Sequence, residues 1–357
     1  MNKLDFLSKD LQKWYLKNKR ELPWRDTKDP YKIWLSEIIL QQTQVVQGLP
    51  YYLKFVKKYP QIEDLANAPE AQLLRDWQGL GYYSRARNLL HSAQIICNEM
   101  EGIFPKRYNE IIKLKGVGKY TAAAIASFAF NESKAVVDGN VIRVIARLFA
   151  IKDAVDQMPG MRKIENLADE LIDSKRPDLH NQAMMELGAM ICTPKNPNCE
   201  ACPFQNHCEA YDRKIQTELP LKSKKIKTRN RYFYYLVIIS KDQILMKKRV
   251  EKDIWQNLYD FPLIEFKKEL NEDSFLKNKR LEQLINAGFD IREISPFQKH
   301  QLSHQSIWAK FIILQNDRIN YSTFEQIFEH SSFFSKVESK DLGKPKLILN
   351  FLEKYIY

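Results

Sequence analysis

The sequence has no apolar run long enough to span a membrane, and it has no internal repeat or low-complexity tract. Its first residues lack the basic and then apolar pattern of a secretory signal, so we expect a cytoplasmic protein. Only five residues are cysteine, and four of them fall between Cys192 and Cys208. This grouping does not resemble the disulfide framework of a secreted protein.

The chain does have length and positive charge. Its 357 residues exceed one typical domain, and its 44% hydrophobic content fits a folded protein, so we expect two domains with separate cores. Lysine and arginine number 56 against 44 acidic residues, a formal net charge of +12. This excess favours an anionic partner, first nucleic acid and second a membrane surface, although many basic proteins have neither.

A single carboxylate stands within an apolar helical stretch at residues 36–45, SEIILQQTQV. Apolar neighbours of Glu37 such as Trp34 and Ile38 would desolvate its carboxyl and raise its pKa, which suits a proton donor. Three amides follow at Gln41, Gln42 and Gln44. Such amides can replace the hydrogen bonds of a lost base pair, so this stretch predicts an enzyme that enters a nucleic acid duplex and protonates a base.

Residues 114–122, LKGVGKYTA, predict a phosphate-binding turn. A Gly-Val-Gly turn before a helix lets backbone N–H groups approach a phosphate at the positive end of that helix. A lone GxG would be weak evidence, but lysines flank this one and small alanines follow it. The pattern is typical of a helix-hairpin-helix, which binds the DNA backbone without reading its sequence.

Two further motifs each have two interpretations. Asp138, in VVDGNVIR, is either a helix N-cap or a functional carboxylate. The turn GLGYYS at 79–84 either presents an aromatic ring outward or simply joins two helices with its tyrosines packed inward. Local sequence does not decide between these alternatives.

The grouped cysteines form a C-x6-C-x2-C-x5-C array. Four thiolates in one compact loop bind either zinc or an iron–sulfur cluster. Zinc ribbons favour two paired C-x2-C knuckles, and this array has one. The spacing therefore favours a 4Fe–4S cluster bound by Cys192, Cys199, Cys202 and Cys208.

The chain changes character near residue 213. Before it, periodicity predicts helices at 3–19, 51–59, 70–77, 84–100, 162–173 and 178–191, and a helix carrying Glu37 that is capped by Asp29-Pro30. Residues 213–231 are basic and non-periodic, as expected of an interdomain linker that can also lie along phosphate. Beyond them a small α+β domain is expected, with strands at 232–239, 244–248 and 307–314 and helices at 273–286 and 344–354.

Taken together, Glu37 within LQQTQV, GLGYYSRARNL, LKGVGKYTAAAI, VDGNVIRV and the cysteine array resemble the adenine DNA glycosylases of the MutY type. These belong to the helix-hairpin-helix superfamily with endonuclease III. The resemblance covers about residues 3–213 and, more weakly, the C-terminal part. It implies removal of adenine mispaired with 8-oxoguanine or G, the first step of base excision repair. It also implies an all-α helix-hairpin-helix glycosylase domain with an iron–sulfur cluster loop, plus a smaller α+β Nudix-like C-terminal domain.

The resemblance also implies an organisation and a setting. The glycosylase domain would cover 1–213, with a six-helix barrel over roughly 23–134 and a cluster module from 1–22 and 135–213. A basic linker would follow at 214–229, and a lesion-recognition domain at 230–357. The expected cofactor is a 4Fe–4S cluster, and the expected partner is double-stranded DNA with an A:8-oxoguanine or A:G mispair. We expect a monomer without membrane contact, associated with the nucleoid in a bacterial cytoplasm.

The resemblance assigns catalytic roles to three residues. Glu37 would protonate adenine, and Asp138 would stabilise the sugar cation that adenine leaves behind or bond to it. Tyr120 stands where bifunctional relatives carry a lysine that forms a Schiff base. A tyrosine cannot do so, which implies a monofunctional enzyme, and its hydroxyl would support the intermediate at Asp138.

The same matching assigns residues that contact DNA. Gln42 and Tyr82 resemble wedge residues that split the base stack. The expected DNA-binding set is Gln42, Leu80, Gly81, Tyr82, Gly116, Val117, Gly118 and Lys119. The expected adenine pocket consists of Trp24, Arg25, Gln182 and Glu186.

The C-terminal part lacks the acidic G-x5-E-x7-R-E-x2-E-E motif of metal-binding Nudix hydrolases, so it is expected to recognise the lesion without hydrolysing a nucleotide. Ser303 and His304 would read 8-oxoguanine, although Leu302 replaces the family's phenylalanine, and a plain strand-connecting turn is the alternative. Two other functions stay open: an endonuclease III-like or mismatch thymine glycosylase/lyase, and a non-catalytic lesion-binding protein.

Overall fold

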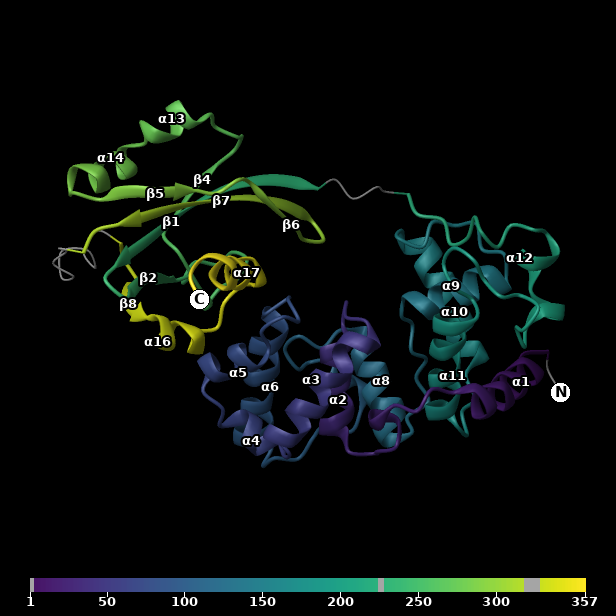
Figure 1. The fold of residues 1–357 in the computed structure, drawn as a ribbon. Helices are drawn as coiled ribbons and strands as arrows, with labels where there is room; N and C mark the ends of the chain where they lie inside the picture. The colour runs from purple at the N-terminus through teal and green to yellow at the C-terminus, as the bar shows by residue number, and fades with distance from the viewer. Residues whose placement is uncertain (1–2, 224–227, 318–327) are drawn as a thin grey trace. The chain divides into compact units, whose positions relative to one another are not determined.

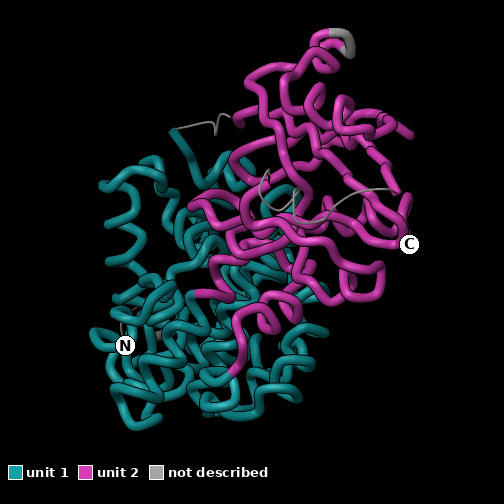
Figure 2. The backbone as a smooth tube through the Cα atoms, turned by 90° about the vertical axis from the view of Figure 1, so that its left-hand side faces the viewer, with its two compact units in different colours: residues 1–67, 88–225 teal, residues 68–87, 226–357 magenta. Residues whose placement is uncertain are grey.

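The computed structural model describes residues 3–223, 228–317 and 328–357, and the chain divides into two compact units (Figure 2). Unit 1 comprises residues 1–67 and 88–225, and unit 2 comprises residues 68–87 and 226–357. The domain limits expected from the sequence differ, because they keep residues 68–87 with the glycosylase domain. No helix in the described ranges is both long and apolar enough to cross a membrane.

Unit 1 is built from helices. Its elements are α1 (Lys3–Asn18), η1 (Pro23–Arg25), α2 (Pro30–Leu40), α3 (Val45–Lys58), α4 (Ile62–Ala66), α7 (Tyr108–Ile111), α8 (Lys119–Phe130), α9 (Gly139–Leu148), α10 (Met158–Leu171), α11 (Pro177–Met190), η2 (Gln205–His207) and α12 (Glu209–Asp212). Helix α6 (Ser84–Glu99) begins in unit 2 and continues in unit 1.

Helix α2 lies in the interior of unit 1 and carries Glu37. Its start is capped as the sequence predicts: the Asp29 carboxylate accepts from Tyr31 N at 3.0 Å, and Pro30 occupies the first turn. The helix is buried from Ile33 to Ile39 and packs against α3 and α8. A helix that is apolar nearly all round must be covered on every side, so this packing carries Glu37 into the protein with its neighbours.

A second core joins α1, α9, α10 and α11. Leu11 of α1, Ile145 of α9, Ile164 of α10 and Leu187 of α11 are all fully buried in it. Asp138 stands at the start of α9, where its side chain accepts from Val141 N. The packing of α9 against α11 therefore sets the position of Asp138.

Unit 2 is a mixed sheet with helices. Its elements are α5 (Glu70–Asp76), β1 (Arg229–Ser240), β2 (Gln243–Lys248), β3 (Tyr259–Asp260), β4 (Leu263–Phe266), α13 (Glu272–Leu276), α14 (Lys279–Asn286), β5 (Asp290–Ile294), β6 (Gln298–Gln301), β7 (Gln305–Gln315), β8 (Ser331–Ser335), α16 (Lys336–Asp341) and α17 (Lys346–Tyr355). The main strand order is β3-β2-β1-β7-β5, with β1 and β7 parallel.

The sheet is covered on both faces because β1 is apolar from Tyr232 to Ile239. Phe233, Tyr235 and Val237 point to the face covered by α17, and the intervening side chains point to the face covered by α13 and α14 (Figure 1). Alternation of side chains along a strand thus produces two cores. The helix expected at 273–286 is two helices, because Asn278 caps the start of α14.

Residues 68–87 belong to unit 2 through polar contacts with its C-terminal residues. Gln78 Oε1 accepts from Lys344 N at 3.1 Å, and the Tyr83 hydroxyl donates to Lys344 O at 3.1 Å. Arg87 donates to Gln256 O at 2.8 Å. The turn at 79–83 is therefore held by the same body as the sheet.

Most of the segment expected as a linker packs on unit 1. Leu219 is buried, Leu221 O accepts from Val155 N at 3.0 Å, and Ser223 N donates to Asp156 at 2.8 Å. Residues 224–227 of that segment lie outside the described residues, and Arg229 already belongs to β1. Because the segment is mostly polar, its composition did not indicate that Leu219 is buried.

Candidate active site

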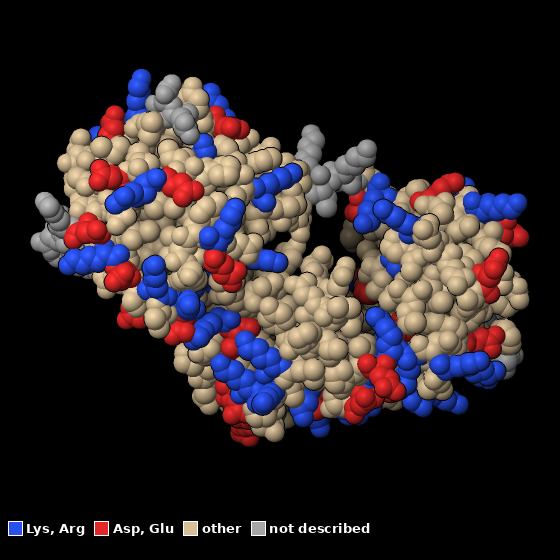
Figure 3. Space-filling view, viewed as in Figure 1, with Lys and Arg blue, Asp and Glu red and all other residues tan. Residues whose placement is uncertain are grey.

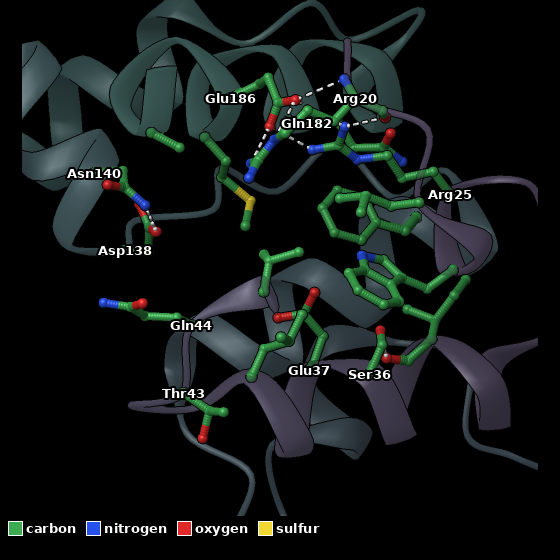
Figure 4. Close-up of a pocket in the computed structure, with 18 of the residues that line it drawn as sticks. Arg20, Arg25, Ser36, Glu37, Thr43, Gln44, Asp138, Asn140, Gln182 and Glu186 are labelled. Atoms are coloured by element: carbon green, nitrogen blue, oxygen red, sulfur yellow. Dashed lines mark hydrogen bonds and ion pairs between the residues drawn. The ribbon is translucent and has the colours of Figure 1, made fainter. Parts of the chain in front are cut away.

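Unit 1 contains a cavity of about 590 Å³ at which the expected catalytic and adenine-pocket residues meet (Figure 4). Helix α2 forms one wall and α11 another, and the start of α9 contributes Asp138. The expected residues that line the cavity are Trp24, Arg25, Glu37, Tyr120, Asp138, Gln182 and Glu186. These side chains come from segments up to 162 residues apart, and one pocket brings them together.

Glu37 is a buried carboxyl with a neutral hydrogen-bond donor. Its side chain is 4% exposed, and the Tyr120 hydroxyl donates a hydrogen bond to its Oε2. Burial raises the pKa of Glu37 to about 7, with Asp138 contributing, while the Tyr120 hydrogen bond and the Arg25 charge oppose the rise. A carboxyl with this pKa can hold a proton near neutral pH and give it to a bound base.

Asp138 shares the cavity but has a different environment. Its Oδ1 accepts from Val141 N at 2.7 Å, and its Oδ2 accepts from Asn140 Nδ2 at 2.8 Å. Burial raises its pKa, whereas these hydrogen bonds favour the ionised form. The N-cap role predicted from the sequence is confirmed. Its carboxylate also faces the cavity, so capping does not withdraw it from chemistry.

Asn140 is itself held in place by Arg143. The guanidinium donates to Asn140 Oδ1 at 2.9 Å, to Gly188 O at 2.7 Å and to Cys192 O at 2.7 Å. Asn140 also lines the cavity, although it is not among the site residues expected from the sequence. Its position two residues after Asp138, at the N-terminus of a helix, was the available signal.

Glu186 lines the cavity, but both of its carboxylate oxygens accept hydrogen bonds from arginines. Oε1 accepts from Arg20 N, Arg20 Nε and Arg25 at 2.9–3.0 Å, and Oε2 accepts from the same two guanidiniums at 2.6 and 2.7 Å. The side chain is fully buried, so this pairing satisfies it. Glu186 therefore orients Arg25 toward the cavity and has little acceptor capacity left for a base.

Gln182 is oriented by a tyrosine from α1. The buried Tyr15 hydroxyl donates to Gln182 Oε1 at 2.6 Å, and burial raises the Tyr15 pKa to about 12, so the hydroxyl keeps its proton. With Oε1 engaged, the amide has its N–H group available for the cavity. The Arg25 guanidinium lies over the Tyr15 ring, 5.5 Å from its centroid. This contact joins the Glu186–Arg25 pair to the Tyr15–Gln182 pair.

The expected DNA-backbone hairpin has the geometry of a tight turn. Gly116 has φ +82°, and a Cβ there would lie 2.7 Å from Asn88 Cβ, so both conformation and space require glycine. Gly118 caps the start of α8, and open space surrounds it. Lys119 is exposed and forms a surface ion pair with Glu165. This leaves the turn accessible to a phosphate.

The expected wedge residues lie in different places. Gln42 follows α2 with φ +56°, in a turn before α3, and does not line the cavity of unit 1, whereas Gln44 does. Tyr82, also with positive φ, is 44% exposed, while the adjacent Tyr83 is buried. Of the two interpretations of the GLGYYS turn, an outward aromatic ring describes Tyr82, and an inward-packed tyrosine describes Tyr83.

Unit 2 has a cavity of its own of about 340 Å³, to which the lesion-recognition candidates contribute. Leu80, Gly81 and Tyr82 line one side, and Ser303 and His304 line the other. The Tyr82 and Ser303 hydroxyls are hydrogen bonded. The turn at 302–304 does connect strands β6 and β7, and Leu302 packs against the sheet core, which leaves the two polar side chains exposed beside the cavity.

The four clustered cysteines surround one small cavity of about 30 Å³. No three His, Cys, Asp or Glu side chains in the described part of the chain are arranged to hold a single metal ion. A 4Fe–4S cluster instead places its four thiolates around a cube of iron and sulfur. The donor set and its arrangement fit such a cluster, which would be held by Cys192, Cys199, Cys202 and Cys208.

Surface charge does not by itself outline a binding face. In Figure 3, acidic side chains lie among the lysines and arginines on the visible face of each unit. The net charge of +12 therefore supports an anionic partner without locating it.

Comparison with known proteins identifies three matching family models. Residues 35–173 match the HhH-GPD superfamily of base excision DNA repair proteins, residues 192–208 match the iron–sulfur binding domain of endonuclease III, and residues 234–354 match a NUDIX domain. The fold is thus a helix-hairpin-helix glycosylase domain with an iron–sulfur cluster loop, followed by a Nudix-like domain. These findings confirm the fold class and the cofactor expected from the sequence.

Among solved structures, a thermostable thymine-DNA glycosylase is similar with 32% identity and a TM-score of 0.54, covering 58% of this chain and 95% of that one. An endonuclease III in complex with DNA has the same fold, with a TM-score of 0.51 at 21% identity, covering 60% of this chain and all of that one.

Curated relatives extend over both units. An adenine DNA glycosylase of Buchnera aphidicola subsp. Baizongia pistaciae is 38% identical over 85% of this chain and 84% of its own length. One from Buchnera aphidicola subsp. Schizaphis graminum is 33% identical over 95% of this chain and 96% of its own length. The human adenine DNA glycosylase is 43% identical over 58% of this chain and 40% of its own. On this evidence the chain belongs to the adenine DNA glycosylase family, whose members are DNA N-glycosylases of base excision repair.

Proposed function

We propose that this protein is a monofunctional glycosylase that removes adenine paired with 8-oxoguanine or G from double-stranded DNA. The observation that carries the proposal is Glu37, a buried carboxyl whose pKa is raised to about 7 and which faces the same cavity as Asp138. Two carboxyl groups in different environments around one pocket suit the cleavage of a glycosidic bond. The names of the relatives support adenine as the base.

The base must leave the duplex before it reaches Glu37. A cavity of about 590 Å³ lies within the range of small-molecule sites and can take a purine. Turning a base out of the stack costs a few kcal/mol, which contacts in the pocket and a residue inserted into the gap offset. Gln42 and Tyr82 are the residues we assign to that gap, because both stand in exposed turns.

The first chemical step transfers a proton. Glu37 gives its proton to N7 of adenine, and the electrons of the N-glycosidic bond pass to the base, which leaves as neutral adenine. Gln182 presents its N–H group to the base, and Arg25, oriented by Glu186, lies on the same side of the pocket. Trp24 packs edge-on against Tyr52 and closes the apolar side.

The second step stabilises the sugar cation that remains after the base has left. Bond cleavage leaves positive charge on the sugar at C1′, and the Asp138 carboxylate compensates it or bonds to it. Water then supplies a hydroxyl group to C1′, and its proton returns to Glu37. Hydrogen bonds from Val141 N and Asn140 keep the Asp138 carboxylate aimed at the cavity throughout.

The reaction is proposed to stop at base removal. A lyase needs an amine that forms a Schiff base with the sugar. Tyr120 lines the cavity, and the resemblance implies a lysine at this position in bifunctional relatives. Treatment with borohydride during turnover tests this point. We expect no covalent adduct with DNA, and efficient trapping would instead support a glycosylase/lyase.

The remaining expected contacts complete the proposal. The turn at Gly116, Val117, Gly118 and Lys119 binds a DNA phosphate, and Ser303 and His304 bind the purine opposite adenine. When bound, the cluster supplies a rigid core for the loop 192–208. The protein acts as a monomer in the bacterial nucleoid, which sedimentation and fractionation would test.

A thymine-mismatch glycosylase is the alternative with a specific observation behind it, since a thymine-DNA glycosylase is 32% identical over 58% of this chain. Base release from A:8-oxoguanine, A:G and T:G duplexes, measured side by side in single turnover, decides between the two. We expect adenine release from the first two and none from the third. Tight binding to A:8-oxoguanine without release of any base would favour a non-catalytic lesion-binding protein.

A further inference from the structure

We propose that residues 214–223 are part of the cluster site, where Gln216 directs its amide at the cluster and Arg147 joins this segment to the cysteine loop. The four cysteines belong to residues 192–208, and the segment follows them in the chain. Composition suggests a linker there. The contacts of the segment indicate another role.

Gln216 lines the same cavity as the four cysteines. Its Oε1 is buried and has no hydrogen-bond partner. A buried amide without a partner is costly, and such groups in native proteins normally bond to something. Rotation of the amide by 180° exchanges oxygen and nitrogen, and the N–H group is then a donor to a cysteine thiolate or an inorganic sulfide. A bound cluster would thus satisfy a side chain that the polypeptide leaves unpaired.

Arg147 joins the segment to the ligand loop. The residue is 2% exposed, and its guanidinium lies 3.4 Å from Cys192 Sγ while it donates to Thr193 O at 2.7 Å and Pro194 O at 2.9 Å. Its Nε donates to Leu219 O at 3.1 Å. Within the described ranges, no carboxylate pairs with it.

A buried charge without a counter-charge is strongly unfavourable. Four thiolates around a 4Fe–4S cluster carry net negative charge, and they lie next to the Arg147 guanidinium. The cluster is therefore the group that compensates this cation. The same guanidinium donates to the carbonyl of Leu219, so a compensated Arg147 also holds the segment in place.

The segment is also anchored by packing. Leu219 is 3% exposed and packs with Ala150, Ala210 and the cysteine Cys208. Beyond it, Val155 N donates to Leu221 O at 3.0 Å. Because these contacts touch a cluster ligand, the segment and the cluster stabilise each other, and the coupling must be reciprocal.

The first test compares Gln216→Leu with Thr217→Val, an exposed neighbour in the same segment, in the cluster-loaded protein. Hydrogen bonds to cluster sulfurs raise the reduction potential because they favour the more negative reduced state. We expect Gln216→Leu to lower the potential and to speed iron loss to a chelator several-fold. Thr217→Val should match the parent. A Gln216→Leu protein with the parent's potential and iron-release rate would overturn the proposal.

The second test uses Arg147→Lys, which keeps the charge and loses the planar fork that reaches both the loop and the segment. We expect faster iron release together with faster trypsin cleavage after Lys222. Faster iron release with unchanged cleavage would show that Arg147 acts on the cysteine loop alone and would remove the segment from the proposal. If this variant does not retain a cluster, the Gln216→Leu comparison decides by itself.

Discussion

The hydroxyl of Tyr120 donates a hydrogen bond to the Glu37 carboxyl inside a cavity that Asp138 also lines. Burial holds the pKa of Tyr120 well above its usual range, so this group stays a donor. Its hydrogen bond lowers the pKa of Glu37 and opposes the larger effect of burial. The net value of about 7 keeps a substantial fraction of Glu37 protonated at neutral pH.

Base release should therefore depend on pH through Glu37. Its protonated form donates the proton, so the single-turnover rate should fall as pH rises through about 7. Tyr120→Phe removes the hydrogen bond that lowers this pKa, and the falling limb should move to higher pH. Glu37→Gln should abolish release. A Glu37→Gln protein that releases adenine at the parent's rate would exclude Glu37 as the acid.

The same pKa predicts an effect on stability. The native pKa of Glu37, about 7, lies above the ordinary value of 4.5, so the native state holds the proton more tightly than the unfolded chain. The free energy of unfolding should then fall as pH rises between these values, by about 3–4 kcal/mol if one pKa unit equals about 1.4 kcal/mol. Glu37→Gln should lose this dependence and be more stable than the parent above pH 7 in urea unfolding.

Asp138 combines a cap with a proposed catalytic role, and two substitutions separate them. Asparagine is an equally good N-cap, so Asp138→Asn should keep the melting temperature while base release falls about 100-fold or more. Asp138→Ala should lose activity and also about 1 kcal/mol of stability. Equal base release by Asp138→Asn and the parent would leave the residue with capping alone.

Tyr15 should affect adenine release through Gln182. Tyr15→Phe removes only the hydroxyl that engages Gln182 Oε1, and loss of one such hydrogen bond should slow release roughly 3- to 10-fold. The matched control is Tyr31→Phe, a buried tyrosine that donates to Tyr59 O at 2.8 Å away from the cavity. It should change stability alone.

A double substitution tests the path of this effect. In a Gln182→Leu background, Tyr15→Phe should cause little further loss of rate, because the amide it orients is gone. Additive losses would mean that Tyr15 acts independently of Gln182.

Glu186 should stabilise the fold at neutral pH and lose that effect in acid. Burial would raise its pKa, but hydrogen bonds from Arg20 and Arg25 lower it to about 2. Because the native pKa lies below the ordinary value of 4.5, the stabilisation is present above pH 4.5 and disappears as pH falls toward 2. Glu186→Gln should cost about 3–5 kcal/mol at pH 7, and the difference from the parent should shrink in acid.

The control for this experiment is Asp153→Asn, which breaks an exposed pair with Lys163. Surface ion pairs contribute little, so its melting temperature should match the parent. An Asp153→Asn effect as large as that of Glu186→Gln would mean that burial is not the cause.

Local patterns predicted much of the fold because their causes are local. The Asp29-Pro30 start of α2 was correct, since a cap and a first-turn proline act within four residues. Helix α3 begins at Val45 and not at the expected residue 51, and Pro50 lies inside the helix. A proline is a weak boundary signal when the helix has a buried face to pack.

The active-site residues also fall into two groups, those recognisable from local sequence and those that only the fold brings together. Glu37 in an apolar helix, the glycines of the hairpin and the spacing of the cysteines could be read from neighbouring residues, because desolvation, turn conformation and ligand spacing are short-range properties. The pairs that orient the pocket could not: Tyr15 with Gln182, and Arg20 with Glu186, join α1 and the segment after it to α11 across more than 160 residues.

The sequence alone thus indicated the groups that this chain carries: a desolvated acid, a glycine turn of the kind that can bind phosphate, and a four-thiolate loop. Only the tertiary structure decided which polar atoms remain available. Packing of α1 against α11 engages one end of Gln182, and the segment after α1 supplies Arg20 and Arg25 to both oxygens of Glu186. Packing of the segment after residue 213 brings Gln216 to the cysteines. A hydrogen bond between distant side chains depends on which faces of two elements meet, and no single stretch of sequence contains that information.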